Sequence, residues 1–133
     1  HPVSVAAAIA NIQGMVEDQL VEKAKKTGQV MAEMLAELVE RHPSVGEVRS
    51  IGLFGAIELV KNKKTREPAA PFGSTSPEMT ALRQYLLAQG VYLYTHWNIL
   101  LLIPPLCITE DQLGEGISVI DKGLATLDQS THH

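Results

Sequence analysis

Residues 47–60 read EVRSIGLFGAIELV, and this stretch decides the fold. Its β-branched, aromatic and other apolar residues favour an extended chain. Gly52 and Gly55 fall inside it. A phosphate-binding loop would place such glycines on a strand-to-helix turn with polar neighbours. Here apolar residues separate them and Ile57-Glu58-Leu59 continues the extended pattern, so the glycines mark the place where a strand bends.

Helical patterns flank this stretch on both sides. An apolar stripe with a period of 3.6 residues predicts a helix from Leu20 to Arg41. Ser76-Pro77 predicts the start of a second helix, which we expect to end at Gly90. Thr109 and Gln112 form a capping box ahead of a third. The apolar stripe of that last helix consists of Leu113, Ile117, Ile120, Leu124 and Leu127.

Two further strands are predicted at residues 91–94 and 99–103, joined by Thr95-His96-Trp97-Asn98. The short connection favours antiparallel pairing. Residues 61–76 contain Pro68, Pro71 and Gly73 and are predicted to be a polar loop. The order of elements predicts an α+β fold, a small antiparallel sheet with helices on one face.

The first helix, expected at residues 3–16, is unlike the others because it is apolar on nearly every side. Such a helix is normally enclosed between two bodies. We therefore expect the chain to be a piece of a larger protein. We divide it into an interdomain helix at residues 1–18, a small domain at residues 19–129, and a tail at residues 130–133, whose His132 and His133 we interpret as derived from a purification tag.

Composition excludes several classes of function. The net charge of −4 argues against a nucleic-acid or anionic-membrane surface, and no apolar run reaches the length of a membrane span. The histidines lack metal-ligand spacing, so no metal site is expected. His42 is interpreted as a helix-end residue favoured by the helix dipole. The single cysteine, Cys107, is expected to be a buried, inert thiol in a cytoplasmic protein.

Most of the aromatic and polar specificity gathers in one place. Tyr92, Tyr94, His96, Trp97 and Asn98 lie in or beside the predicted hairpin, and alternation would put both tyrosines on one face of a strand. This cluster is interpreted either as a ligand surface or as a hairpin whose aromatics cover the core. Glu58, alone in an apolar run, is interpreted as a charge at a sheet edge or as a residue with a buried polar partner. Residue patterns identify no catalytic set.

Three stretches resemble the C-terminal part of class III aminotransferases, pyridoxal-phosphate enzymes of fold type I. Residues 1–8 (HPVSVAAA) resemble the segment after the cofactor lysine. Residues 48–59 (VRSIGLFGAIEL) resemble the Arg-Gly-x-Gly-Leu strand motif, with Ser50 where glycine is usual. Residues 103–110 (IPPLCITE) resemble the Pro-Pro-Leu-x-Ile-Thr-Glu motif before the last helix. Residues 66–72 and 94–98 further resemble the taurine–pyruvate aminotransferase branch.

The resemblance implies a C-terminal small domain that packs against a missing large domain in a homodimer. The lysine that binds pyridoxal phosphate and the other cofactor-binding residues then lie upstream, so no catalytic or cofactor-binding residue is assigned here. The chain alone is expected to bind no cofactor and to be inactive. Lys23, Lys61 and Lys122 lie in polar surface contexts, where a lysine is a poor nucleophile.

The resemblance also implies a substrate-binding role for Tyr94, His96 and Trp97 at the entrance to the active site. Many family members hold the substrate carboxylate with an arginine ten residues before the Pro-Pro pair, and Tyr94 occupies that position. The implied reaction of the complete enzyme is amino transfer from an ω-amine donor, such as taurine or β-alanine, to a keto acid such as pyruvate. The alternative is a stand-alone α+β ligand-binding or dimerisation module.

Overall fold

The computed structural model describes residues 1–130, so the interpretation of His132 and His133 lies outside the described residues. The elements, in chain order, are α1 (Pro2–Glu17), α2 (Leu20–Arg41), β1 (Val45–Ile51), β2 (Phe54–Asn62), β3 (Glu67–Pro68), α3 (Pro77–Ala88), β4 (Tyr94–His96), β5 (Ile99–Leu102) and α4 (Glu110–Ser130).

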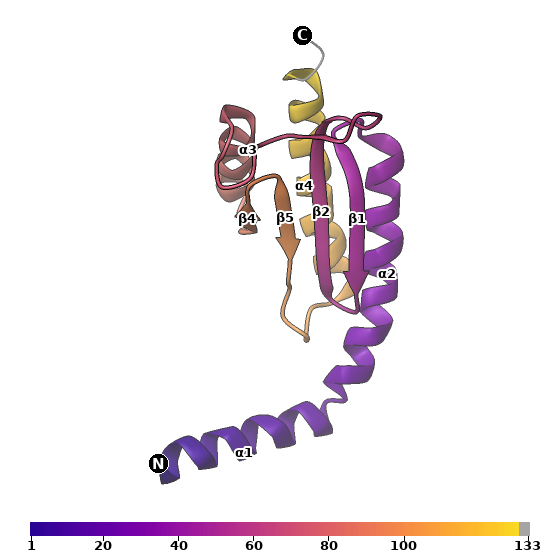
Figure 1. The fold of residues 1–133 in the computed structure, drawn as a ribbon. Coiled ribbons are helices and arrows are strands. Elements are labelled where there is room, and N and C mark those ends of the chain that lie inside the picture. The colour runs from indigo at the N-terminus through magenta and orange to yellow at the C-terminus, as the bar shows by residue number, and fades with distance from the viewer. Residues whose placement is uncertain (131–133) are drawn as a thin grey trace.

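The central sheet is antiparallel, with the strand order β1-β2-β5-β4, and β3 pairs with β2 outside this path. Figure 1 shows α4 behind the sheet, α2 beside β1 and α3 beside β4. The predicted α+β fold is confirmed. The register pairs Ile57 with Leu100, and both side chains are fully buried on the face that the helices cover. Residues one position away point to the opposite, open face.

The inner layer follows the predicted apolar stripes. All five stripe residues of α4 are buried, and on α2 the chain buries Ala24, Thr27, Gly28, Met31, Leu35 and Leu38. The helix ends also agree with the sequence. The Ser76 hydroxyl accepts a hydrogen bond from the Met79 N–H at 3.2 Å, and Gly90 adopts a φ of +80° just after α3. Thr109 and Gln112 make the reciprocal bonds of a capping box before α4.

Two glycines let α2 approach the sheet. Gly52 forms the turn between β1 and β2 with a φ of +54°, a left-handed conformation that glycine adopts at low cost. A Cβ atom placed on Gly28 of α2 would lie 2.4 Å from the carbonyl carbon of Gly52. The glycines therefore mark a hairpin turn between two antiparallel strands and not a bend within one strand, and this turn is in direct backbone contact with α2.

Helix α1 points away from the sheet and buries none of its residues (Figure 1). Gln19, with a φ of +52°, forms the elbow that separates α1 from α2. Residues 2–16 carry no charged side chain, although Val3, Val5, Ile9, Ile12 and Val16 are all more than half exposed. No helix in the described part of the chain is long and apolar enough to span a membrane.

Three local expectations were wrong. The first predicted hairpin strand begins at Tyr94 instead of Val91, so Tyr92 lies outside it and does not share a strand face with Tyr94. The predicted polar loop of residues 61–76 contains the short strand β3, in which Pro68 pairs with Val60 of β2 and Glu67 pairs with Asn62. Cys107 is exposed, because the turn after the two prolines carries it outside the sheet and before α4.

Candidate functional site

The hairpin of β4 and β5 carries the residues that the sequence singled out. Its turn consists of Trp97 and Asn98, and Trp97 adopts a φ of +54°. The Asn98 side-chain amide donates to the Leu59 carbonyl at 2.9 Å, and the Leu59 N–H donates to the Asn98 carbonyl at 2.8 Å. These two bonds fix the turn to β2, so the left-handed backbone of Trp97 is held by its neighbour.

Tyr94 and His96 lie on the open face of the sheet. They pair with Leu101 and Ile99, whose side chains alternate with the buried Leu100 on the helix side. The Tyr94 hydroxyl and His96 Nδ1 are 3.2 Å apart, within hydrogen-bond distance, and Tyr94 is 52% exposed. Tyr94 therefore does not cover the core, and the hairpin presents a polar, aromatic surface to the outside.

Trp97 continues this surface by ring contacts. Its ring centroid lies 3.9 Å from that of His96 and 4.0 Å from that of Phe72. Phe72, in the loop between β3 and α3, is 83% exposed. Residue pattern gave no reason to place Phe72 at the site, because the contact joins a loop to a hairpin 25 residues later in the chain. Structure thus brings together Tyr94, His96 and Trp97 and adds Phe72.

A charge network occupies the same open face on β1 and β2. Arg66 bonds Glu47 at 2.7 Å and lies 3.7 Å from Glu58, while Arg49 bonds Glu47 at 3.0 Å and Glu58 at 3.3 Å. The hydrogen bonds from Arg66 and then Arg49 hold the pKa of Glu47 below its usual range. Glu58 is in the middle of the sheet, not at an edge, and its partners are two arginines.

His42 is buried between two aspartates and not merely placed at a helix end. Its Nδ1 lies 2.6 Å from Asp128 Oδ2 and its Nε2 lies 2.8 Å from Asp121 Oδ1. Both aspartates belong to α4, whereas His42 caps α2. The interpretation from the helix dipole missed these partners because they lie 79 and 86 residues further along the chain. This His42 clamp ties the ends of two helices together. Among the described residues, no group of three or more His, Cys, Asp and Glu side chains could hold a metal.

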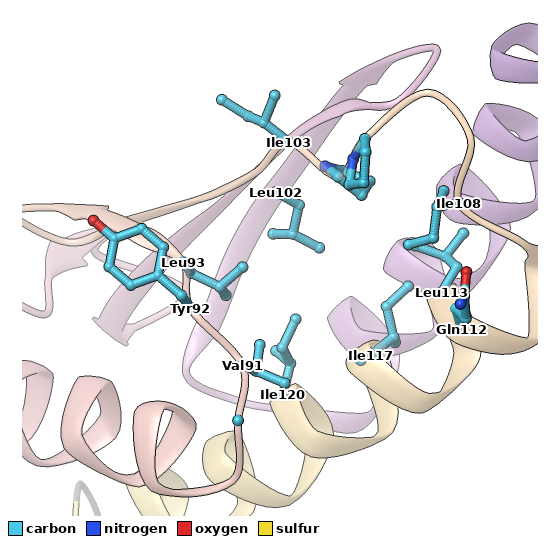
Figure 2. Close-up of a pocket in the computed structure, with 14 residues that line it drawn as sticks. Val91, Tyr92, Leu93, Leu102, Ile103, Ile108, Gln112, Leu113, Ile117 and Ile120 are labelled. Carbon is cyan, nitrogen blue, oxygen red and sulfur yellow. The ribbon is translucent and has the colours of Figure 1, made fainter. Parts of the chain in front are cut away.

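An apolar pocket of about 360 Å³ opens where Val91–Leu93 diverges from the end of β5, beside the first half of α4 (Figure 2). In Figure 2, Leu102, Ile117 and Ile120 point into it, whereas the Tyr92 ring points away from these side chains. No acidic or basic side chain lines it. It can accept apolar groups, and its lining offers no general acid or base that points into it.

The lysines do not form a site for pyridoxal phosphate, the cofactor that the sequence resemblance implies. All seven lysines are exposed, and two of them pair with glutamates, Lys26 with Glu110 at 3.7 Å and Lys61 with Glu67 at 3.1 Å. A covalent bond to the cofactor needs a lysine amine that is desolvated or otherwise activated. The described residues therefore do not fit the covalent site of this group, and none is assigned to it.

Comparison with known proteins places these features in a family. A family model described as aminotransferase class-III matches residues 1–124. Isoleucine 2-epimerase of Lentilactobacillus buchneri is 36% identical over 129 residues, which are 96% of this chain and 27% of that protein. Taurine–pyruvate aminotransferase of Bilophila wadsworthia is 35% identical over 126 residues, which are 93% of this chain and 28% of that protein.

Solved structures give the same result for the fold. Taurine:2-oxoglutarate aminotransferase from Bifidobacterium kashiwanohense, in complex with PLP and glutamate, matches with a TM-score of 0.93 and 33% identity. The match covers 98% of this chain and 29% of that one. A thermostable omega transaminase mutant from Pseudomonas jessenii matches with a TM-score of 0.88 and 26% identity, over 100% and 29% of the two chains. The chain thus spans less than a third of the length of the relatives that it matches.

Proposed function

Because the chain belongs to the class-III aminotransferase family, we propose that it is the C-terminal small domain of a pyridoxal-phosphate-dependent aminotransferase. The observation that carries this proposal is the match of the family model to residues 1–124, together with a chain that spans 29% of a structural relative. Pyridoxal phosphate, when bound, supplies the electron sink for such a reaction. The lysine that holds it would belong to the part of the enzyme not described here.

The exposed helix α1 supports the presence of a large domain. Burial of a valine or isoleucine side chain contributes about 1.5–3 kcal/mol, so the uncharged α1 surface gains much from being covered. Proteins rarely leave such a surface open to water. In this proposal α1 is the interdomain helix and residues 19–129 are the small domain.

The open sheet face is the part of this domain that we place at the substrate entrance. Tyr94, His96, Trp97 and Phe72 form a surface with a phenol hydroxyl, an imidazole and two apolar rings. A tyrosine donates one hydrogen bond to an acid group and brings no charge, whereas an arginine donates two and brings a charge. Tyr94 therefore favours a donor whose acid group does not need a bidentate arginine. A sulfonate such as taurine fits this requirement, and β-alanine is the carboxylate counterpart.

The relatives of this chain carry names of several different activities. They include an isoleucine 2-epimerase and a homologue of ethanolamine-phosphate phospho-lyase beside the aminotransferases. The relative named for taurine and pyruvate supports amino transfer to pyruvate as the reaction to test first. A homodimer in the cytoplasm is the assembly and compartment that we propose. A stand-alone binding or dimerisation module remains the rival, in which a second copy would have to cover α1.

The test is amino transfer by the polypeptide that contains this chain. Taurine and β-alanine are offered as donors with pyruvate as acceptor, and alanine formation gives kcat/KM for each donor. We expect transfer from both donors by the polypeptide and none by the 133-residue chain alone. Tyr94→Arg should raise the β-alanine to taurine ratio, because the guanidinium can grip a carboxylate with two charge-assisted bonds, each worth about 1.5–3 kcal/mol.

Tyr94→Phe is the matched variant, since it removes the hydroxyl and keeps the ring. It should lower kcat/KM for both donors modestly and leave their ratio near that of the wild type. Alanine formation by the 133-residue chain alone would contradict its assignment as a domain without the cofactor lysine. Racemisation of an amino acid without transfer by the polypeptide would replace the proposed reaction by epimerisation. Equal ratios in all three proteins would remove Tyr94 from the substrate site.

A further inference from the structure

A second cavity lies between α3, the loop before it and the β4–β5 hairpin. Its volume is about 220 Å³, and its lining consists of the apolar Met79 and of Thr75, Thr80, Arg83, Gln84, Thr95 and Trp97. This Arg83 cavity shares only Trp97 with the candidate substrate surface. It is therefore a separate place on the molecule with its own chemistry.

Arg83 is the charged group of this cavity, and it differs from the other arginines of the chain. Arg41 pairs with Asp121 at 3.0 Å, and Arg49 and Arg66 both pair with Glu47. Arg83 has no acidic partner within 4 Å among the described residues. An arginine keeps its charge under all ordinary conditions, so the cavity carries one full positive charge.

No acidic side chain in the lining offsets that charge. Glu78 also belongs to α3, but it lines a different pocket together with Tyr85 and Leu127, on the opposite face of the helix. Hydrogen bonds from its own backbone N–H and then from the Ser76 hydroxyl lower the pKa of Glu78, so that carboxylate already has its donors. An anion that entered the Arg83 cavity would meet no competing carboxylate there.

Neutral polar side chains line the cavity together with Arg83. Thr80 donates its hydroxyl to the Ser76 carbonyl at 3.0 Å. The Thr75 hydroxyl lies 3.5 Å both from that carbonyl and from Thr80 Oγ1, a distance at which a hydrogen bond is weak. The Thr75 hydroxyl can therefore turn to a ligand at little cost, and the exposed Gln84 side chain belongs to the same lining. Together with Arg83 they offer donors of the kind that an oxoanion accepts.

The size of the cavity restricts the ligand. A water molecule takes about 30 Å³ of liquid, and pockets for drug-sized ligands begin at about 300 Å³. The Arg83 cavity is between these values and suits a small group. We infer that Arg83, Thr75 and Gln84 form a binding site for a small oxoanion, a phosphate, sulfonate or carboxylate, next to Trp97 and centred away from Tyr94, His96 and Phe72.

Trp97 makes this site directly measurable, because it is the only tryptophan of the chain. The emission of the 133-residue chain is recorded during titration with inorganic phosphate, methanesulfonate or acetate, while sodium chloride keeps the ionic strength constant. We expect a saturable change in emission. The midpoints of the three titrations compare the affinities for phosphate, sulfonate and carboxylate. In a parallel titration followed by NMR, the Arg83 Nε–H resonance, assigned from its absence in Arg83→Lys, should shift with the same midpoint.

Two variants distinguish binding of the anion in the Arg83 cavity from nonspecific electrostatic attraction to the protein surface. Arg83→Gln should weaken binding about tenfold or more, since a hydrogen bond to a charged group and the charge itself are lost. Lys122→Gln removes the same charge from the exposed surface of α4 and should leave the midpoint unchanged. Circular dichroism checks that each variant keeps the wild-type fold.

The wild-type titration alone can overturn the inference. An emission change that is linear in anion concentration, or the absence of any change, would show that no site exists. A response that survives in Arg83→Gln, or is lost equally in Lys122→Gln, would show that the anion acts elsewhere. Failure here leaves the proposed aminotransferase reaction untouched, because that proposal does not use Arg83.

Discussion

Helices α1 and α2 follow one another in the chain, but α2 buries its apolar side chains and α1 leaves them exposed. Helix α2 has charged residues on one side and buries its stripe against the sheet, whereas α1 has no charge from Pro2 to Val16 and buries nothing. The stripe of α2 is sufficient for packing within this domain. The surface of α1 suits enclosure between two bodies, in agreement with the large domain proposed above. Consecutive helices can thus show which surfaces serve the domain and which serve its surroundings.

The largest expected difference comes from truncating one apolar side chain in each helix. Leu38→Ala in α2 should lower the free energy of unfolding by about 2–5 kcal/mol, because Leu38 is fully buried and the change leaves a cavity. Ile9→Ala in α1 should change it by no more than about 0.5 kcal/mol, because Ile9 is half exposed. Urea denaturation followed by circular dichroism measures both. Equal losses would mean that α1 folds back onto the domain in solution.

A glycine in each helix gives a sharper pair with opposite signs. Gly28→Ala should destabilise the domain by about 1–3 kcal/mol, since the new methyl group would overlap the backbone at Gly52. Gly14→Ala should add about 0.5–1 kcal/mol to the stability of α1, because nothing lies within 4 Å and alanine is the better helix former. The helical signal during thermal unfolding reports both changes. A stabilising Gly28→Ala would contradict the close contact of α2 with the β1–β2 turn.

The sequence was informative where short-range patterns determine structure. The helix of residues 20–41 was predicted with its bounds, and the caps at Ser76 and Thr109 are present. These features depend on neighbours three or four residues away. The start of β4, by contrast, depends on where β5 stops pairing with it, and the strand pattern of residues 91–93 did not contain that information.

The candidate site was predictable in part for the same reason. Tyr94, His96 and Trp97 are consecutive or alternate residues of one hairpin, so their proximity followed from the sequence. Phe72 and the partners of Glu58 reach their places through tertiary packing. The substrate role of Tyr94 rests on family resemblance, because no pattern of its own distinguishes a binding tyrosine from a packing one.

The smallest expected effect lies on the open sheet face, where the charges are exposed. Arg66→Gln should raise the pKa of Glu47 toward its usual value, because the hydrogen bond from Arg66 is the main cause of the depression. A carboxyl group whose pKa is lower in the folded state stabilises the fold at any pH above its pKa in the unfolded state, which is near 4.3. This stabilisation is lost as the pH falls through the pKa of the folded state. The variant should therefore lose slightly less stability on acidification than the wild type. NMR titration of the Glu47 side chain measures the shift, and Lys64→Gln, with no ion pair on this face, is the control.

The His42 clamp has a consequence for the order in which the domain assembles. Helix ends normally open and close on their own, and their amide hydrogens exchange first. Here the imidazole of His42, at the end of α2, joins that helix to the C-terminal half of α4. Its partners Asp121 and Asp128 are 79 and 86 residues further along the chain. Closing so long a loop has an entropic cost that local contacts avoid, so we expect the clamp to form late in folding. Once formed, it makes two distant helix ends a single cooperative unit, which the exchange of their amides would report together.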